Sequence, residues 1–405
     1  INHYSFNESF RLLCIIFINL IKFFIMYQQK ICIIGDGLAG LATAAILSKE
    51  NLSIDLYASD KKNKNIDSRT TAISDSNYLY IKNILNLVDS KLFWSCKKID
   101  LFFEEKGKII NFLNFSEKKK NFMHIFQNRK LKIKLKKIIS QKKNIKLIKR
   151  NIKNIDINEG SLIMAKKKIF YDLIILSVGS VSKLYDKIES GRSIKKNYEE
   201  LAITATIKHD VKIKNPSQFF LREGPLAVLP FQKNIFSIVW SVNKSFYEAN
   251  EKNLKEILNK KLRFLLNVKN FKSIENFKSF PINLNLKTKY FKKNVLILGD
   301  GLHSVHPIAG QGFNLVLRDI KKLVELMSEN SKLGLLFKDS LLLQNFYNAR
   351  KPENNLFGFG INLTNYFFKD NKYFRTLKKG ILNNINSFDF IKKISQSVAN
   401  KGITL

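Results

Sequence analysis

Apolar and polar positions alternate in blocks that predict strands and helices along most of the chain. An apolar run, a glycine turn, an apolar helical stretch and a second apolar run follow one another over Lys30–Asp60, which predicts the opening of a doubly wound sheet. Residues 99–115 alternate as strands do, whereas residues 128–140 repeat Leu and Ile at the spacing of an amphipathic helix. Residues 67–74 are polar, and we expect a loop there.

The second half of the chain changes character twice. Residues 168–180 read as one buried strand that runs into a glycine turn, and residues 200–242 read as long strands of an antiparallel sheet in a different domain. Residues 295–319 return to the first pattern, with a strand, a glycine-rich loop and a helix that opens near Gly312. From Leu341 onward the pattern is helical and rich in Phe.

Composition indicates a globular protein with an unusual charge. The 405 residues, 45% of them hydrophobic, suffice for two domains that share one cleft. The net charge of +37 raises nucleic acid or an anionic membrane as a partner. The lysines are spread over the whole length and accompany abundant Asn and Ile, so we interpret the charge as compositional drift that leaves solvated lysine faces. A nucleic-acid partner is not expected, whereas attraction to an anionic lipid surface stays open.

The N-terminal segment Leu12–Ile25 is apolar but too short, and too interrupted by Asn19 and Lys22, to predict a membrane span. We expect translation to start at Met26, with residues 1–25 as an upstream extension; a short interfacial anchor is the alternative. The cysteines have neither disulfide nor metal spacing, which favours an intracellular protein with reduced thiols. These are Cys14, Cys32 and Cys96.

The first glycine motif predicts a nucleotide site. Gly35, Gly37 and Gly40, with Leu38 and Ala39 between the last two, follow a strand and open a helix, the context in which glycines bind a pyrophosphate at a helix N-terminus. The motif fits NAD, NADP or FAD. The acidic residue expected after the second strand falls at Ala58, and Asp60 is our candidate for that role.

The downstream stretch "GDGLHSVHPIAGQGFNLVLRD", residues 299–319, offers helix N–H groups and a positive dipole to an electron-rich ligand. His303 and His306 lack a third ligand pattern, so we expect no metal. His306 is either a proton carrier or a hydrogen-bonded loop histidine, and Pro307 stiffens the loop.

Taken together, the two glycine motifs resemble those of the class A flavoprotein monooxygenases, the fold of para-hydroxybenzoate hydroxylase. Within that class the chain is most similar to the ubiquinone-biosynthesis hydroxylases, and the resemblance extends from Met26 to the C-terminus. The shorter matching stretches are "RTTAIS" at Arg69, "QNRKL" at Gln127, "YEELAI" at Tyr198, "EGPLAVLP" at Glu223, "FPI" at Phe280 and "FYNARKPENN" at Phe346.

The resemblance implies an α/β fold: a doubly wound FAD-binding domain, an interleaved antiparallel β-sheet substrate domain and a helical C-terminal tail. The implied boundaries are 26–180 and 285–340 for the two parts of the FAD-binding domain, 181–284 for the substrate domain and 341–405 for the tail.

The resemblance also implies the positions of cofactor contacts. Asp300 would bond the ribityl chain of FAD, and the helix N-terminus would meet the N1–C2=O edge of the flavin, where reduced flavin carries negative charge. Arg69 and Asn128 would contact FAD from the other side. The helix N-terminus comprises Gly310, Gln311, Gly312, Phe313 and Asn314.

The implied activity is the hydroxylation of a polyprenylated phenol in ubiquinone biosynthesis, with FAD, O₂ and NAD(P)H. The implied location is cytoplasmic, with possible peripheral contact at the inner face of a membrane and with other quinone-biosynthesis enzymes. One departure counts against full activity: Val178 stands where the family has an aspartate. The alternatives are a flavin monooxygenase for another aromatic and a catalytically impaired partner subunit.

Overall fold

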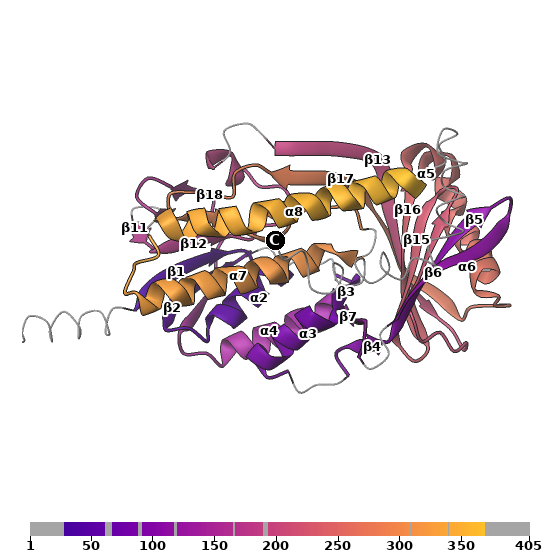
Figure 1. The fold of residues 1–405 in the computed structure, drawn as a ribbon, viewed down its shortest axis with the longest axis horizontal. Helices are drawn as coiled ribbons and strands as arrows, with labels where there is room; N and C mark the ends of the chain where they lie inside the picture. Colours follow the sequence, from indigo (N-terminus) through magenta and orange to yellow (C-terminus); the bar gives the residue numbers. More distant parts are fainter. Residues whose placement is uncertain are drawn as a thin grey trace, which may run out of the picture.

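The computed structural model describes residues 28–60, 67–87, 91–116, 120–164, 167–188, 193–307, 310–338 and 340–368 (Figure 1). The apolar segment Leu12–Ile25, Met26 and Cys14 lie outside the described residues. Cys32 and Cys96 are buried free thiols. No helix within the described ranges is both long and apolar enough to cross a membrane.

A six-stranded sheet forms one layer of the molecule, in the order β18-β19-β12-β1-β2-β8. Its neighbouring strands run parallel except for the pair β18 and β19. The central strands are almost fully buried runs of Ile and Leu, as expected for a parallel sheet covered on both faces. The strands are β1 (Gln29–Ile34), β2 (Leu52–Ala58), β8 (Ile145–Lys149), β12 (Leu173–Leu176), β18 (Phe291–Lys292) and β19 (Val295–Ile297).

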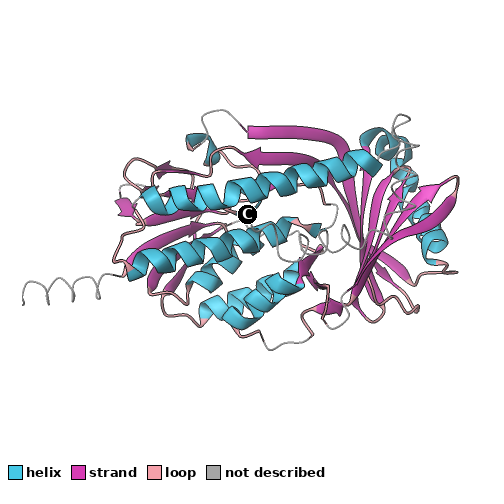
Figure 2. Cartoon of the chain, viewed as in Figure 1, coloured by secondary structure: helices cyan, strands magenta, loops and turns pink. Residues whose placement is uncertain are grey.

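Most of the helices gather beside this sheet, as Figure 2 shows. They are amphipathic: α4, for example, buries Leu131, Leu135 and Ile139, which lie four residues apart on one face. A three-stranded sheet, β9 (Ile155–Asp156), β10 (Ser161–Met164) and β11 (Lys167–Phe170), shares the same apolar core. The helices are α2 (Leu38–Leu47), α3 (Asp75–Leu85), α4 (Asn128–Ser140), α7 (Gly312–Lys332) and α8 (Ser340–Phe368).

A second, eight-stranded sheet stands at the other end of the molecule (Figure 1), in the order β20-β17-β13-β16-β15-β14-β5-β6. Its neighbours are antiparallel except for β14 and β5. Helices α5 (Lys244–Asn250) and α6 (Leu254–Leu266) accompany it, and α6 packs Leu254, Leu258 and Leu262 against its apolar face. The strands are β5 (Lys98–Glu105), β6 (Lys108–Ser116), β13 (Ser193–Lys208), β14 (Ser217–Leu221), β15 (Gly224–Gln232), β16 (Ile235–Asn243), β17 (Ser273–Lys287) and β20 (His303–Ser304).

A small sheet, β3 (Thr70–Ser74), β7 (Met123–Gln127) and β4 (Trp94–Cys96), adjoins the large one. The expectation of a loop over residues 67–74 is therefore wrong for residues 70–74. Several of these residues have polar side chains, which is typical of a loop, but their backbone pairs antiparallel with β7. The hydrogen bonds between the two strands, rather than bonds to water, satisfy their peptide groups. Within the described residues there are also three short 3₁₀ turns: η1 (Tyr185–Lys187), η2 (Glu251–Asn253) and η3 (Gly299–Gly301).

The predicted α/β class, with a doubly wound layer and an interleaved antiparallel sheet, is confirmed. Residues 168–180 do not form one strand: the chain breaks at Tyr171 and Asp172 into β11 and β12, which belong to different sheets. The domain boundaries stay predictions, and the chain enters the large sheet first at Lys98, within the segment 26–180. Of the expected C-terminal helical region, residues 369–405 lie outside the described residues.

Candidate functional site

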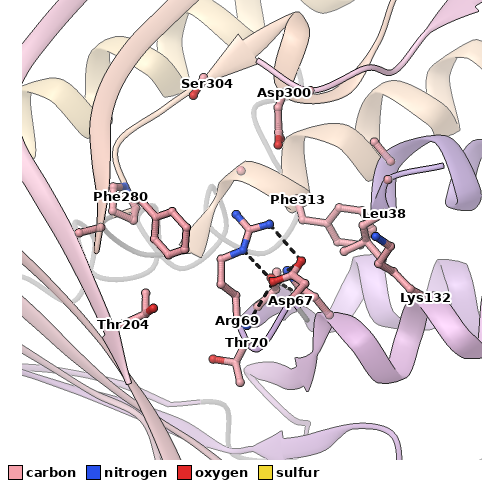
Figure 3. Close-up of a pocket in the computed structure, with 18 of the residues that line it drawn as sticks. Leu38, Asp67, Arg69, Thr70, Lys132, Thr204, Phe280, Asp300, Ser304 and Phe313 are labelled. Carbon is pink, nitrogen blue, oxygen red and sulfur yellow. Dashed lines mark hydrogen bonds and ion pairs between the residues drawn. The ribbon is translucent and has the colours of Figure 1, made fainter. Parts of the chain in front are cut away.

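A cavity of about 820 Å³ lies between the two large sheets. This volume falls within the roughly 300–1,000 Å³ typical of small-molecule and cofactor sites. Figure 3 shows its lining from both sides, with Asp67, Arg69 and Leu38 on one side and Thr204 and Phe280, from the eight-stranded sheet, on the other. The carboxyl ends of β1, β2, β12 and β19 open toward it, which is where open α/β sheets bind ligands.

The turn between β1 and α2 contains two glycines that the fold requires and one that faces open space. A Cβ on Gly35 would lie 2.2 Å from the Ser177 carbonyl oxygen, and a Cβ on Gly40 would lie 2.0 Å from the Gly35 carbonyl oxygen. A Cβ on Gly37 would meet nothing within 4 Å. The N-terminus of α2 has neither a side-chain cap nor an acidic residue in its first turn, so its N–H groups and dipole are available to an anion.

A second helix N-terminus, that of α7, borders the same cavity. Gly310, Gly312 and Phe313 line it, and α7 also lacks a side-chain cap and an acidic residue in its first turn. Two uncapped helix N-termini at one cavity suit a ligand with two separated electron-rich groups, such as the pyrophosphate and the flavin ring of FAD.

Asn314 serves the fold rather than the cavity. Its side-chain nitrogen donates to the Ala72 and Gly310 carbonyl oxygens at 3.1 and 3.2 Å. Its side-chain oxygen accepts the Ser74 N–H at 2.9 Å and a side-chain N–H of Asn77 at 2.8 Å. The side chain thereby fixes β3 against the start of α7, and the expected contact of the Asn314 backbone with the ligand stays a prediction.

Asp300 lies in the η3 turn directly after β19 and points into the cavity (Figure 3). Tyr185 packs between this turn and the turn at Gly179. Its hydroxyl donates to the Gly179 carbonyl oxygen at 2.7 Å, and a Cβ on Gly301 would lie 2.0 Å from that hydroxyl. Burial raises the pKa of Tyr185, so the phenol stays protonated and continues to donate. Tyr185, which sequence reasoning missed, therefore positions the loop that carries Asp300.

Arg69 reaches into the cavity from the opposite side and is paired with Asp67. Its Nε and Nη2 atoms donate to the two Asp67 oxygens at 2.9 and 3.0 Å, and Asn128 Nδ2 donates to Asp67 at 3.4 Å. Burial alone would raise the pKa of Asp67, but the Arg69 hydrogen bonds and charge lower it. Hydrogen bonding to Asp67 in turn raises the pKa of Arg69. The pair stays ionised and presents a fixed guanidinium.

The two histidines of the downstream motif bond to separate carboxylates. His306 Nε2 lies 2.8 Å from Glu200 Oε2, and His303 Nε2 lies 2.6 Å from Asp319 Oδ2; all four residues are buried. The described residues hold no group of three or more His, Cys, Asp or Glu side chains suited to a metal. Only His306 lines the cavity. Glu200 lies 106 residues away in the sequence and gave no local signal.

The end of the cavity beside the last residue of β2 has no acidic side chain in its lining where one was expected. The Asp60 carboxylate accepts the Asn151 N–H at 3.2 Å and does not line the cavity, so its expected ribose contact stays a prediction that the lining does not support. Ala58 and Arg150 line this end instead. Val178, in the place of the expected aspartate, also lines the cavity.

Twelve of the predicted site residues line this one cavity. They are Gly35, Gly37, Leu38, Ala39, Arg69, Asn128, Asp300, His306, Pro307, Gly310, Gly312 and Phe313. Four do not: Gly40, Asp60, Gln311 and Asn314. Gly40 packs against the Gly35 carbonyl oxygen and Gln311 directly precedes α7, and the contacts expected of these four residues stay predictions.

Comparison with known proteins agrees with the geometry. Residues 186–332 match the family model described as "FAD binding domain", which supports FAD as the cofactor. The ubiquinone biosynthesis monooxygenase COQ6 of Dictyostelium discoideum is 27% identical over 244 residues, 48% of this chain and 49% of that protein. The ubiquinone hydroxylase UbiL of Rhodospirillum rubrum is 29% identical over 160 residues, 39% of this chain and 37% of that protein. The chain thus matches about half the length, or less, of these curated relatives.

Solved structures share the fold. The p-nitrophenol 4-monooxygenase PnpA of Pseudomonas putida DLL-E4 superposes with a TM-score of 0.73 at 12% identity, covering 93% of this chain and 99% of that one. PqsL of Pseudomonas aeruginosa superposes with a TM-score of 0.71 at 15% identity, covering 88% of this chain and all of that one. The chain thus shares the fold of these FAD-dependent monooxygenases, and part of its sequence is similar to ubiquinone-biosynthesis monooxygenases.

Proposed function

We propose that the chain binds FAD and hydroxylates the aromatic ring of a polyprenylated phenol in ubiquinone biosynthesis, with O₂ and a reduced nicotinamide as co-substrates. The observation that carries the proposal is a cavity that joins two uncapped helix N-termini and Asp300 to a wall of uncharged side chains. The names of the relatives COQ6 and UbiL support the pathway.

The donor set fits the parts of FAD. The α2 N-terminus and Gly37 would bind the pyrophosphate, Asp300 the ribityl hydroxyls, and the α7 N-terminus the N1–C2=O edge of the ring. Bound FAD supplies the redox chemistry, since it accepts electrons from the nicotinamide and activates O₂.

The large sheet supplies the substrate side. Among the described residues of β13, β15, β16 and β17 that line the cavity, none is charged. Thr204 Oγ1 is buried there without a hydrogen-bond partner among the described residues, and it would bond the phenol hydroxyl. His306, held by Glu200, would carry the proton that the phenol exchanges. Leu229, Val239 and Ile282 keep this half of the cavity dry.

The proposal places the protein in the cytoplasm, in peripheral contact with the inner face of a membrane and with other quinone-biosynthesis enzymes. The charge of +37 and the apolar substrate support a surface position.

The direct test combines the purified full chain with a deletion strain. The protein should bind FAD, accept electrons from NADH or NADPH under anaerobic conditions, and convert a prenylated phenol to its hydroxylated product. The deletion strain should accumulate a quinone precursor that lacks one ring hydroxyl. A protein that ignores added FAD, or a strain with a normal quinone profile, contradicts the proposal.

A catalytically impaired partner subunit is the second candidate, and Val178 favours it. The side chain lines the cavity where the family places a carboxylate. In an active enzyme, Val178→Asp should tighten FAD binding or speed flavin reduction by up to about tenfold, the equivalent of about 1.4 kcal/mol. In an impaired subunit the same change should restore no hydroxylation.

The measurement is anaerobic flavin reduction by NADH and NADPH in the wild type and in Val178→Asp. Rapid reduction of the wild type rules out the impaired subunit. No reduction in either protein, together with an unaltered quinone profile on deletion, rules out the hydroxylase.

A further inference from the structure

We propose that Arg150 holds the adenosine half of FAD, in the place where a carboxylate usually binds the ribose. The inference rests on the proposed binding of FAD and concerns the far end of the cavity, beyond the turn at Gly37. There the lining comes from Ala58, Ser59, Arg150 and Asn151.

The fold fixes Arg150 beside the end of β2. Ala58, the last residue of β2, pairs in parallel register with Lys149 of β8, and the Arg150 N–H donates to the Ala58 carbonyl oxygen at 2.9 Å. The carboxyl ends of two neighbouring parallel strands meet at this point, which is where such sheets bind the adenosine of a dinucleotide. The pairing of β8 with β2 therefore places the backbone of Arg150 at the proposed adenosine position.

No free carboxylate competes for this position within the described residues. Ala58 carries none, and Asp60 lies outside the lining, where it accepts the Asn151 N–H. Asp36, in the glycine turn, is paired with Lys136 at 3.1 Å. The Arg150 guanidinium itself forms no hydrogen bond or ion pair with any described residue, so it is available to a ligand.

The chemistry of a guanidinium suits adenosine. Its planar face stacks on an aromatic ring system, and its N–H groups donate to ring nitrogens and ribose oxygens. A carboxylate does the opposite, because it accepts hydrogen bonds from the ribose hydroxyls. The contact predicted here is therefore with the adenine face and the ribose oxygens.

The test is a ligand series, since FMN carries the flavin, ribityl chain and one phosphate of FAD but no adenosine. Binding of FAD and FMN to the full chain is measured by quenching of flavin fluorescence. Arg150→Ala should weaken FAD about tenfold and leave FMN unchanged. Arg150→Lys retains the charge without the planar face and should recover little of the loss. Lys153→Ala, which removes an equal charge from an exposed residue outside the lining, should change neither affinity.

The inference is overturned by unchanged FAD affinity in Arg150→Ala, by an equal loss for FMN, or by an equal loss in Lys153→Ala. Full recovery of FAD affinity in Arg150→Lys also overturns it, because the positive charge alone would then explain the effect of Arg150. Charge alone would also suffice if this end of the cavity bound the phosphate of a 2′-phosphorylated dinucleotide. A wild type that binds neither FAD nor FMN fails the proposed function itself, and the inference falls with it. Circular dichroism of each variant verifies that the exposed substitution leaves the fold intact.

Discussion

Gly37→Ala is expected to abolish detectable FAD binding while the apo protein stays folded. Gly37 has φ −67° and ψ 177°, which any residue adopts, and a Cβ there meets nothing within 4 Å. The methyl group would instead fill the space through which a pyrophosphate approaches the N–H groups of α2. Each charge-assisted hydrogen bond lost costs about 1.5–3 kcal/mol, so the loss of two weakens binding by roughly 100-fold or more.

Gly40→Ala is the matched control, with the same methyl group three residues along. Its Cβ would lie 2.0 Å from the Gly35 carbonyl oxygen, so the change should destabilise the apo fold itself. Thermal unfolding of the apo proteins and FAD titration separate the two effects. A Gly37→Ala protein with wild-type affinity would show that the pyrophosphate does not lie at this turn.

Elements with a strong local pattern were predictable from the sequence. The helix over residues 128–140 has the predicted bounds because Leu131, Leu135 and Ile139 repeat at helical spacing and all three are buried. The strand over residues 70–74 was missed because its sequence is polar and its stability depends on pairing with β7, about fifty residues away. Residues 168–180 were misread because the apolar run continues across the break between two sheets.

The site residues likewise divide into those with a local sequence signal and those without one. Glycine turns are local, so the pattern alone placed Gly35, Gly37 and Gly312. Partners that tertiary structure brings together left no sequence signal: Glu200 meets His306 only in the fold, and Arg150 reaches the cavity only because β8 pairs with β2. The motif also did not reveal where each side chain points, since Asn314 belongs to the downstream motif but its side chain bonds to β3.

The second large effect is expected at Arg350, which lies in the C-terminal stretch "FYNARKPENN". Its Nε donates to Asp319 Oδ1 at 2.6 Å, and its Nη2 donates to Asn354 Oδ1 at 3.0 Å. It also pairs with Glu353. Asp319 bonds in turn to His303, in strand β20 that follows the turn with Asp300. The cluster therefore ties α8 and α7 to one wall of the cavity.

Arg350→Met should destabilise the protein by about 3–5 kcal/mol, since it leaves Asp319 buried without its main counter-charge. Lys322→Met is the matched control on α7: it breaks a surface pair with Glu325 at 3.5 Å and should cost about 1 kcal/mol or less. Urea unfolding of the three proteins measures both costs. Equal losses in the two variants would contradict the importance assigned to burial.

The effect of Arg350→Met should depend on pH in a definite direction. Burial raises the pKa of Asp319, but the charges of Arg350 and His303 and their hydrogen bonds outweigh it, so the pKa lies below its ordinary value. The folded wild type therefore binds fewer protons at Asp319 than the unfolded chain does, and the stabilisation is complete above the ordinary pKa of about 3.9 and lost as the pH falls through the lower, folded value. Without Arg350, His303 is left to oppose burial, so the balance moves toward the protonated acid. The stability difference between wild type and Arg350→Met should thus be largest near neutral pH and shrink toward acid, and a difference that stays constant from pH 7 down to acid unfolding would show that Asp319 is not the residue whose charge Arg350 balances.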